Sequence, residues 1–357
     1  MVHKVGFEHV KYKKIRRFQE EFYWDRKMMN ICFATDDNYV KTTAIAIMTV
    51  LLTNKDEEIS FYILSQSLTE ENKEILKSTV LRYSSKSHIQ FCILTSSIID
   101  KFSSTIKKEN HVSLATYIRL FIPSLLSNNV QKILYLDGDI ICADSLRPLY
   151  EIDLKDCSLV AAHDERTCDS ESFQRLKYPM ENGYFGAGVL LINVDYWRKN
   201  NIQQKTLDFV FKNKEICVWH DQDALDKILN GTVKFCHIKY NVYEHLYENE
   251  NNYPALFNNE IKEAIENPVI IHFCSGRKPW TFESRCPFTA TWLKLYKQLF
   301  GKKCRLTHRY KGKTKFLWSI KRILHKFGIK KYEEFDYSKG YSGLRKQIEE
   351  RYFKDKK

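Results

Sequence analysis

The sequence has no apolar run long enough to cross a membrane. A transmembrane helix needs about 18 or more consecutive apolar residues, and no segment of this 357-residue chain approaches that length. The chain opens with MVHKVGFEHVKYKKIRRFQEEF, which carries charge without an apolar core and so disfavours a cleaved signal peptide. We therefore expect the protein to be made and kept in the cytoplasm.

Glycine and proline are scarce, with 12 and 7 residues, which disfavours a fibrous or low-complexity chain. The 10 cysteines include no CxxC pair, so a zinc ribbon or a dithiol redox motif is also disfavoured. We expect these cysteines to be reduced and mostly buried, because they occur within segments such as ICFAT, FCILT and HFCSG. Apolar residues make up 43% of the chain, enough for a sizeable core.

The net charge of +13 has a definite location. Residues 301–357 contain 19 Lys and Arg against 6 Asp and Glu, whereas residues 1–300 contain 38 of each sign and are neutral. This argues against a basic body built around nucleic acid and for an appended surface-binding segment. We expect a basic extension at 1–27, a main domain at 28–301 and a basic tail at 302–357.

Strand-like and helix-like segments alternate from Met28 onward. The segments MNICFA, EISFYILS, HIQFCIL and QKILYLDGDIIC are typical of strands. Helices are expected over Thr42–Leu52, over Thr69–Tyr83 with a capping box in LTEEN, and around Ala115–Leu126. This order predicts an α/β fold whose mainly parallel sheet has helices on both faces. Ligands of such sheets bind beyond the carboxyl ends of the strands.

Asp137-Gly138-Asp139 follows the apolar strand segment ILYL. Side chains one residue apart in an extended segment point to the same side, so these two carboxylates could hold one Mn²⁺ or Mg²⁺ ion. Glycine between them would let a ligand approach the backbone. The alternative is an ordinary acidic turn, since Asp and Gly are common turn residues.

Two further segments carry candidate site residues. His272 ends the apolar run in VIIHFCSGRKPW and could complete the metal site, or serve as a structural histidine. Lys278 in the same segment would offset charge on a departing diphosphate. In WHDQDAL, Asp221 and Gln222 could hydrogen-bond sugar hydroxyls or face an anomeric carbon, or could simply begin a helix.

These segments together resemble the family 8 retaining glycosyltransferases of the GT-A fold, close to the bacterial lipooligosaccharide galactosyl- and glucosyltransferases. The resemblance covers about Met28 to Trp280 and rests on six motifs in the family's order. They are ICFATDDNYV, HVSLATYIRLFIP, LYLDGDIIC, YFGAGVLLINVDYW, HDQDAL and HFCSGRKPW. LYLDGDIIC matches the family's DXD metal motif. The resemblance implies a GT-A catalytic domain at 28–301 with a mainly parallel central sheet, followed by a basic helical tail.

The resemblance also implies a role for each matching residue, with a UDP-sugar as donor and Mn²⁺ or Mg²⁺ as metal. The residues that would hold the nucleotide and its diphosphate are Ala34, Asp36, Asn38, Tyr39, Gly138, Gly276 and Lys278, with Tyr39 stacking on uracil. Those that would bind the metal are Asp137, Asp139 and His272, and Arg119 and Asp137 would contact the transferred sugar. Asp221 and Gln222 would lie nearest the reacting carbon, and Asp164, Gly186 and Cys274 on the acceptor and sugar side.

One departure concerns the donor sugar. The family commonly has asparagine where this chain has Gly186, in YFGAGVLLIN, so the choice between UDP-galactose and UDP-glucose stays open. The route to retention is also open. The acceptor could attack from the face that UDP leaves, or Asp221 could act as the nucleophile of a double displacement.

The tail segment KFLWSIKRILHKFGIK has the pattern of an amphipathic helix. Its apolar residues recur at helical spacing with basic residues between them: Phe316, Ile320, Ile323, Leu324 and Phe327. Such a helix can lie on an anionic membrane, and the alternative is a helix docked on the protein's own body. Membrane attachment would suit a lipid-linked lipopolysaccharide acceptor at the inner face of the cell membrane.

Three other hypotheses remain at this point. The acceptor could be a protein or a soluble glycan, as for some relatives in the family. The pI of about 9.1 allows a nucleic-acid-binding protein, which the neutral charge of residues 1–300 disfavours. A member that binds nucleotide-sugar without transfer would rest on Gly186 alone.

Overall fold

The computed structural model describes residues 28–94, 117–248, 253–331 and 340–354, and its centre is a seven-stranded sheet. The strand order is β3-β2-β1-β4-β7-β6-β8. The strands are β1 Met29–Ala34, β2 Ile59–Ser65, β3 His88–Ile93, β4 Lys132–Leu136, β6 Leu159–Ala162, β7 Val189–Asn193 and β8 Val233–Cys236. Only β7 runs antiparallel to its neighbours β4 and β6, so the predicted mainly parallel α/β sheet is confirmed.

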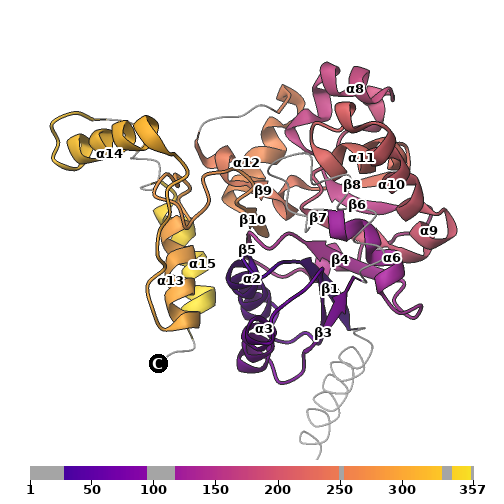
Figure 1. Cartoon of the computed structure of the whole chain (residues 1–357), viewed down its shortest axis with the longest axis horizontal. Helices are drawn as coiled ribbons and strands as arrows, with labels where there is room; N and C mark the ends of the chain where they lie inside the picture. Colours follow the sequence, from indigo (N-terminus) through magenta and orange to yellow (C-terminus); the bar gives the residue numbers. More distant parts are fainter. Residues whose placement is uncertain (1–27, 95–116, 249–252, 332–339, 355–357) are drawn as a thin grey trace, which may run out of the picture.

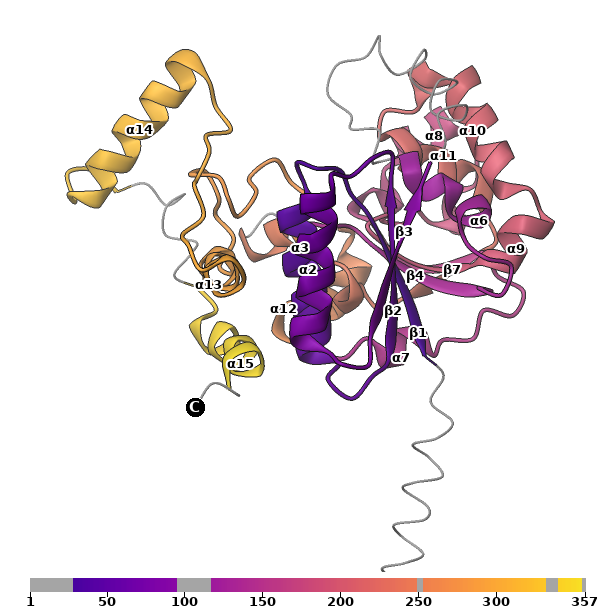
Figure 2. The same cartoon turned by 60° about the horizontal axis from the view of Figure 1, so that its bottom comes forward.

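Helices cover both faces of this sheet (Figures 1 and 2). On one face lie α2 Val40–Thr53 and α3 Glu70–Tyr83; on the other lie α6 Ile122–Leu125, α9 Val194–Lys199, α10 Ile202–Lys212 and α11 His220–Leu229. Successive strand residues enter opposite cores: Ile31 and Phe33 pack with α2, and Cys32 packs on the other side. Burial on both faces explains why these strands read as nearly continuous apolar runs.

One of the helix predictions needs correction. Thr69 caps α3 by accepting a hydrogen bond from the Asn72 backbone N–H, but the reciprocal half of the predicted capping box is missing. Asn72 occupies the position of the returning side chain and donates to Asp37 Oδ1 instead. The helical stretch predicted around residues 115–126 is confirmed over its described part: residues 117–125 are helical, with the 3-10 turn η1 Arg119–Phe121 directly before α6.

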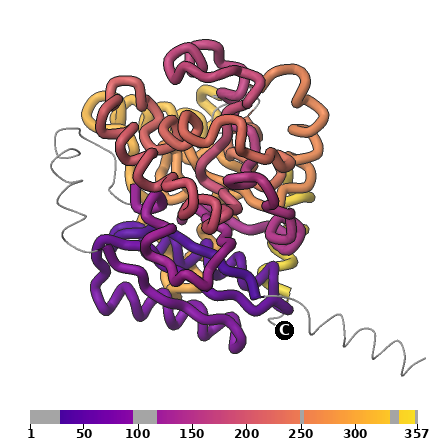
Figure 3. Tube along the Cα trace, turned by 90° about the vertical axis from the view of Figure 1, so that its right-hand side faces the viewer, coloured from indigo at the N-terminus to yellow at the C-terminus, as the bar shows by residue number. Residues whose placement is uncertain are grey.

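A second, three-stranded sheet stands beside the first, in the order β5-β10-β9. Its strands are β5 Ile140–Cys142, β9 Val242–Tyr243 and β10 Ile270–His272, and α12 Asn258–Glu266 packs nearby. β10 runs antiparallel to β5, and the register places His272 opposite Ile140. In Figure 3 the chain up to residue 94 gathers on one side of the body. The two acidic residues Asp137 and Asp139 lie between β4 of the large sheet and β5 of the small one.

The C-terminal region contains helices of two kinds. α15 Ser342–Phe353 packs beside α13 Thr289–Phe300, and its Ile348 and Tyr352 are buried in the same core as Trp292. α14 Gly312–Lys326 projects away from the body in both views (Figures 1 and 2). Of its residues only Trp318 is buried. Within the described ranges, no helix is both long and apolar enough to span a membrane.

The cysteines are less uniformly buried than expected. Five side chains are buried, and two are exposed at Cys168 and Cys274. The predicted basic extension at 1–27 lies outside the described residues.

Candidate active site

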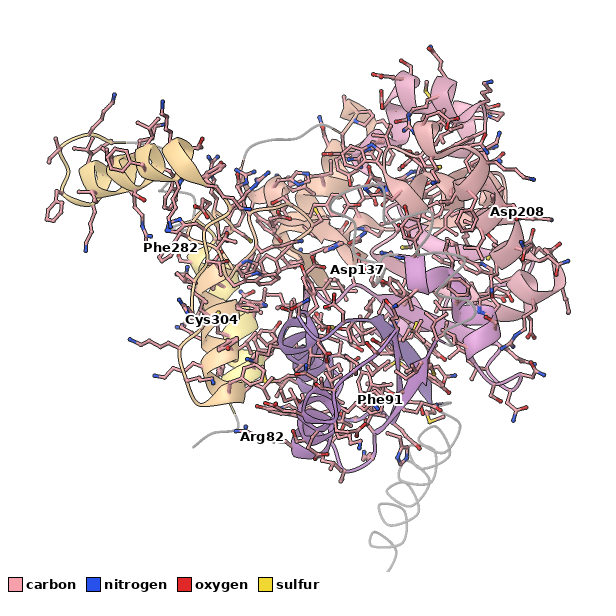
Figure 4. All side chains as sticks on the ribbon, in the orientation of Figure 1. Arg82, Phe91, Asp137, Asp208, Phe282 and Cys304 are labelled. Carbon is pink, nitrogen blue, oxygen red and sulfur yellow. The ribbon has the colours of Figure 1, made fainter. Side chains whose placement is uncertain are left out.

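Two carboxylates and an imidazole meet where the two sheets adjoin. Asp137 follows β4, Asp139 precedes β5, and His272 ends β10. His272 Nε2 lies 3.3 Å from Asp139 Oδ1 and 3.7 Å from Asp137 Oδ2. One ligand atom from each of the three residues lies within 4.8 Å of the other two. The structure thus brings His272 to an acidic pair that is more than 130 residues earlier in the sequence, and Figure 4 places Asp137 near the middle of the body.

The two carboxylates converge for a different reason from the one predicted. β4 ends at Leu136, and residues 138–139 form a turn rather than extended backbone. A side chain at Gly138 would place its Cβ 2.6 Å from Thr43 Oγ1, so this turn packs tightly on the first part of α2. The glycine is therefore required by packing between the turn and α2.

His272 is oriented by a residue that the sequence did not single out. Its Nδ1–H donates to Asn241 Oδ1 at 2.9 Å, which leaves the Nε2 lone pair facing Asp137 and Asp139. Asn241 is only 1% exposed. Gly188 makes room for the ring, because a Cβ there would lie 2.3 Å from His272 Cε1 and 3.0 Å from Asp137 Oδ2. Only the run of apolar residues before His272 hinted at this arrangement.

Lys278 compensates the negative charge of this cluster. Its Nζ donates to Asp139 Oδ2 and to the Phe273 carbonyl. Burial by itself would raise the pKa of Asp139, but Lys278 and His272 overcome this and hold that pKa below its ordinary value. Two carboxylates and one imidazole form a donor set that suits Mn²⁺ or Mg²⁺. The residues therefore fit a divalent metal with a cation beside it.

Arg119 joins the cluster to α11. Its guanidinium lies 3.1 Å from Asp137 Oδ1 and 2.9 Å from Asp221 Oδ2, and it covers the Tyr135 ring. Tyr135 in turn donates to Asp137 Oδ1 at 2.6 Å. Burial raises the pKa of Asp221 to about 6, although Arg119 opposes this shift. Asp137 and Asp221 are thus linked through one buried cation.

Gln222 lies in a network around Asp164. Gln222 Oε1 accepts from the Ala187 N–H at 3.0 Å, and its Nε2 donates to Asp164 Oδ2 at 3.3 Å. Tyr243 also donates to Asp164 Oδ2, at 2.7 Å, and Arg166 pairs with the other oxygen. Asp164 is consequently 1% exposed and fully engaged with the protein.

Gly186 lies directly beneath Tyr243 and Asn241. A Cβ at this position would lie 2.2 Å from Tyr243 Oη and 2.9 Å from Asn241 Nδ2. Side chains from β9 and the residue before it therefore fill the space that a residue 186 side chain would need. Glycine in place of the family's asparagine therefore goes together with the close packing of Asn241 and Tyr243 on this position.

The predicted nucleotide residues lie at the end of β1. Asp36 Oδ1 accepts from the backbone N–H groups of Asn38 and Tyr39 at 3.0 and 2.9 Å, which shapes the turn after Ala34. Tyr39 meets Trp280 edge to face, with ring centroids 5.6 Å apart. One aromatic pair thus joins the turn after β1 to the segment that follows Lys278.

Cys274 and Gly276 occupy the turn between β10 and Lys278. The Cys274 thiol contacts Glu244 Oε2 at 3.4 Å, and Ser275 N–H donates to Glu244 Oε1 at 2.9 Å. Glu244, His245 and Cys274 form a second group with ligand-like spacing. The Glu244 contacts hold this turn in place, and His245 pairs with Glu165 at 3.1 Å.

A mixed sheet with helices on both faces, and with a charged cluster at its strand ends, defines a GT-A-type α/β fold. The model of Glycosyl transferase family 8 matches residues 30–284, and the chain belongs to this family.

Known relatives and a solved structure agree with this assignment. The chain is 26% identical to General stress protein A of Bacillus subtilis, over 73% of this chain and 91% of that protein. It is 27% identical to a lipopolysaccharide 1,2-glucosyltransferase of Escherichia coli, over 84% and 88%. The crystal structure of galactosyltransferase LgtC in complex with donor and acceptor sugar analogs superposes with a TM-score of 0.67 at 27% identity, covering 76% of this chain and 96% of that one.

Proposed function

We propose that this glycosyltransferase moves galactose or glucose from a UDP-sugar to a saccharide acceptor, a lipid-linked lipopolysaccharide or lipooligosaccharide core, with retention of configuration. The observation that carries the proposal is the cluster of Asp137, Asp139 and His272 with Lys278 beside it. The similarity to a lipopolysaccharide glucosyltransferase and to the galactosyltransferase LgtC supports both the donor class and the acceptor class.

In the proposed reaction, Asp137, Asp139 and His272 would hold the metal. When bound, Mn²⁺ or Mg²⁺ would supply positive charge that stabilises the departing diphosphate. Lys278 adds a second positive charge, and Arg119 and Asp137, which form an ion pair, contact the transferred sugar. Asp221 is 2% exposed and ion-paired with Arg119, which favours attack from the face that UDP leaves over a double displacement through Asp221.

Donor hydrolysis tests the proposed activity without a known acceptor. Purified protein is incubated with Mn²⁺ and a panel of UDP-sugars, and UDP release is followed. We expect release from one UDP-sugar that is lost with EDTA and in Asp139→Asn. The control Asp208→Asn should keep it, because Asp208 is a half-buried residue of α10 that Figure 4 shows at the edge of the molecule, away from Asp137. If neither UDP release nor Mn²⁺-dependent UDP binding occurs, the proposal is wrong.

The same proposal places the protein on the inner face of the cell membrane through α14. Its apolar face is uncovered: Phe316 and Phe327 are 66% and 71% exposed, and Ile323 is 54% exposed. Basic residues flank this face, and each Lys or Arg near an anionic surface adds about 1 kcal/mol of attraction. The exposed apolar and basic surface of α14 therefore favours a lipid-linked acceptor over a protein or a soluble glycan.

Vesicle co-sedimentation tests the α14 prediction. A variant with Phe316, Ile320, Ile323 and Phe327 all replaced by serine should lose binding to vesicles that contain anionic lipid. The matched control replaces Leu81 and Leu256, which are 72% and 74% exposed on the body. Deletion of residues after 302 is unsuitable, because it would also remove α15 from the core. Equal binding by the α14 variant and the wild type would contradict membrane attachment.

A further inference from the structure

We propose that Arg309, from the segment between α13 and α14, is an additional binding residue for the donor diphosphate. This inference rests on the proposed function, together with the family resemblance, which implies that Gly276 and Lys278 contact the diphosphate. Arg309 lies beyond residue 284, where the match to the family model ends. The residue therefore belongs to a part of the chain to which the family match assigns no role.

The segment that carries Arg309 is hydrogen-bonded to the residues after Lys278, and we call this contact between residues 307–309 and 280–283 the clasp. Thr307 N–H donates to the Trp280 carbonyl, and Phe282 N–H donates to the Thr307 carbonyl, both at 2.9 Å. The carboxylate of Glu283, only 2% exposed, contacts His308 Nδ1 and accepts from the Arg309 backbone N–H, each at 2.9 Å. A buried carboxylate with two such partners holds the backbone at residue 309 in a defined position.

This clasp places the Arg309 guanidinium on the turn of Gly276. A Cβ built at Gly276 would lie 3.0 Å from both Cζ and Nε of Arg309. Arg309 is exposed, and its Cζ lies 6.0 Å from the centroid of the Tyr310 ring. Within the described part of the chain, its guanidinium forms no hydrogen bond or ion pair. Lys278, two residues after Gly276, is already bonded to Asp139 and Phe273. Arg309 thus adds N–H donors that are available to a ligand at the turn of Gly276, where Lys278 already bonds to the protein.

The chemistry of the guanidinium suits a diphosphate. Its planar fork of N–H groups matches two phosphate oxygens at once, whereas an ammonium acts as a point charge. The clasp also contacts the nucleotide side of the site, because Trp280 lies against Tyr39. A UDP moiety that extends from Tyr39 toward Gly276 would therefore pass along the surface that presents Arg309. Figure 4 shows Phe282, part of this clasp, on the side of the body that faces α14.

Binding measurements on Arg309→Ala and Arg309→Lys test the inference. With Mn²⁺ present, calorimetry should show that Arg309→Ala binds UDP about 5- to 20-fold more weakly than the wild type, from the loss of a charge-assisted hydrogen bond at an exposed site. Arg309→Lys should lie between the two. Uridine, which lacks phosphate, should bind both variants and the wild type alike in competition experiments. Arg305→Ala, an exposed arginine of the same segment, is the matched control and should bind UDP normally.

Each other outcome overturns the inference. Unchanged UDP affinity in Arg309→Ala would exclude a phosphate contact. An equal loss of affinity for uridine and UDP would show that Arg309 only stabilises the Gly276 turn and does not contact phosphate. Absence of UDP binding in the wild type would overturn the proposed function together with this inference. A melting temperature of Arg309→Ala equal to that of the wild type ensures that a weaker UDP affinity reports binding rather than folding.

Discussion

At the scale of single residues, the site depends on glycines that leave space for the side chains of larger residues. Gly186 and Gly188 precede β7, and side chains at these positions would collide with Tyr243 and His272. The colliding groups come from chain segments more than 50 residues away. Asn241 links the two positions, because it lies over Gly186 and also accepts from His272. His272 is thus held in place by Asn241 and by the space at Gly188, in addition to β10.

Replacement of Asn241 by alanine should weaken metal binding. Without an acceptor on Nδ1, the His272 ring loses the contact that keeps the Nε2 lone pair toward the carboxylates. Loss of such a partner typically costs about 10- to 100-fold in metal affinity. Titration of Mn²⁺ followed by electron paramagnetic resonance would measure this, with Asn200→Ala as a control whose amide bonds only within α9. Equal Mn²⁺ affinity in Asn241→Ala and the wild type would refute the orienting role.

Asp221 should make stability depend on pH. Burial raises its pKa from an ordinary value of 3.8 to about 6. As pH rises between these values the folded state keeps a proton that the unfolded state releases, so the stabilising contribution is full at about pH 4 and lost above about pH 6. Asp221→Asn cannot titrate, so its free energy of unfolding relative to the wild type should rise by up to about 3 kcal/mol from pH 4 to pH 7.

Urea unfolding in EDTA across this pH range would measure the difference. EDTA keeps any metal from altering the charge near Asp137. A difference between variant and wild type that stays constant with pH would show that folding does not raise the pKa of Asp221, which would contradict this prediction.

At the scale of elements, the basic tail contains two helices of opposite character. α14 exposes its apolar residues, whereas α15 buries Ile348 and Tyr352 against the body. Tyr352 donates to the Cys142 carbonyl at 2.6 Å, and Glu349 pairs with Lys294 of α13. The change in charge at residue 301 therefore does not coincide with the end of the packed body. The membrane-association role proposed for 302–357 applies to α14.

Replacement of Ile348 by alanine should destabilise the fold. The side chain is 1% exposed in the core that also contains Trp292, and its truncation leaves a cavity. The free energy of unfolding should fall by about 2–4 kcal/mol. Leu317→Ala on α14, 59% exposed, should change it by less than about 0.5 kcal/mol. Equal effects of the two substitutions, measured by chemical denaturation, would mean that α15 does not belong to the core.

At the scale of the whole molecule, the site joins segments from both sheets and from α11. Asp137 follows a strand of the large sheet, His272 ends a strand of the small one, and Asp221 lies in the first turn of α11. A ligand bound among them would add contacts between parts of the chain that Arg119 and Lys278 already join through ion pairs.

Bound UDP and Mn²⁺ should therefore stabilise the whole fold. At a ligand concentration of about 100 times Kd, mass action adds about 2.7 kcal/mol to the free energy of unfolding. The melting temperature should rise with UDP and Mn²⁺ together, and the rise should vanish with EDTA or in Asp139→Asn. Differential scanning calorimetry would measure the shift. A rise that survives both treatments would place UDP binding somewhere other than the metal cluster.

The sequence by itself determined the first four strands of the large sheet, the helices on both of its faces and the position of the acidic pair. Apolar runs that end in Asp137 and in His272 carry this information locally, because a strand buried on both faces must be apolar and must end where polar residues begin. The family motifs then led to Lys278, Arg119 and Asp221. These features needed no knowledge of which distant segments are neighbours.

Tertiary structure alone decided how these residues are held. Asn241 against His272, Tyr243 above Gly186 and Arg309 on Gly276 are contacts between segments at least 30 residues apart, and no local pattern encodes them. The same holds for the different fates of α14 and α15, which share a basic composition. Whether an apolar helical face is buried or exposed depends on the surface opposite to it, and that surface exists only once the chain has folded.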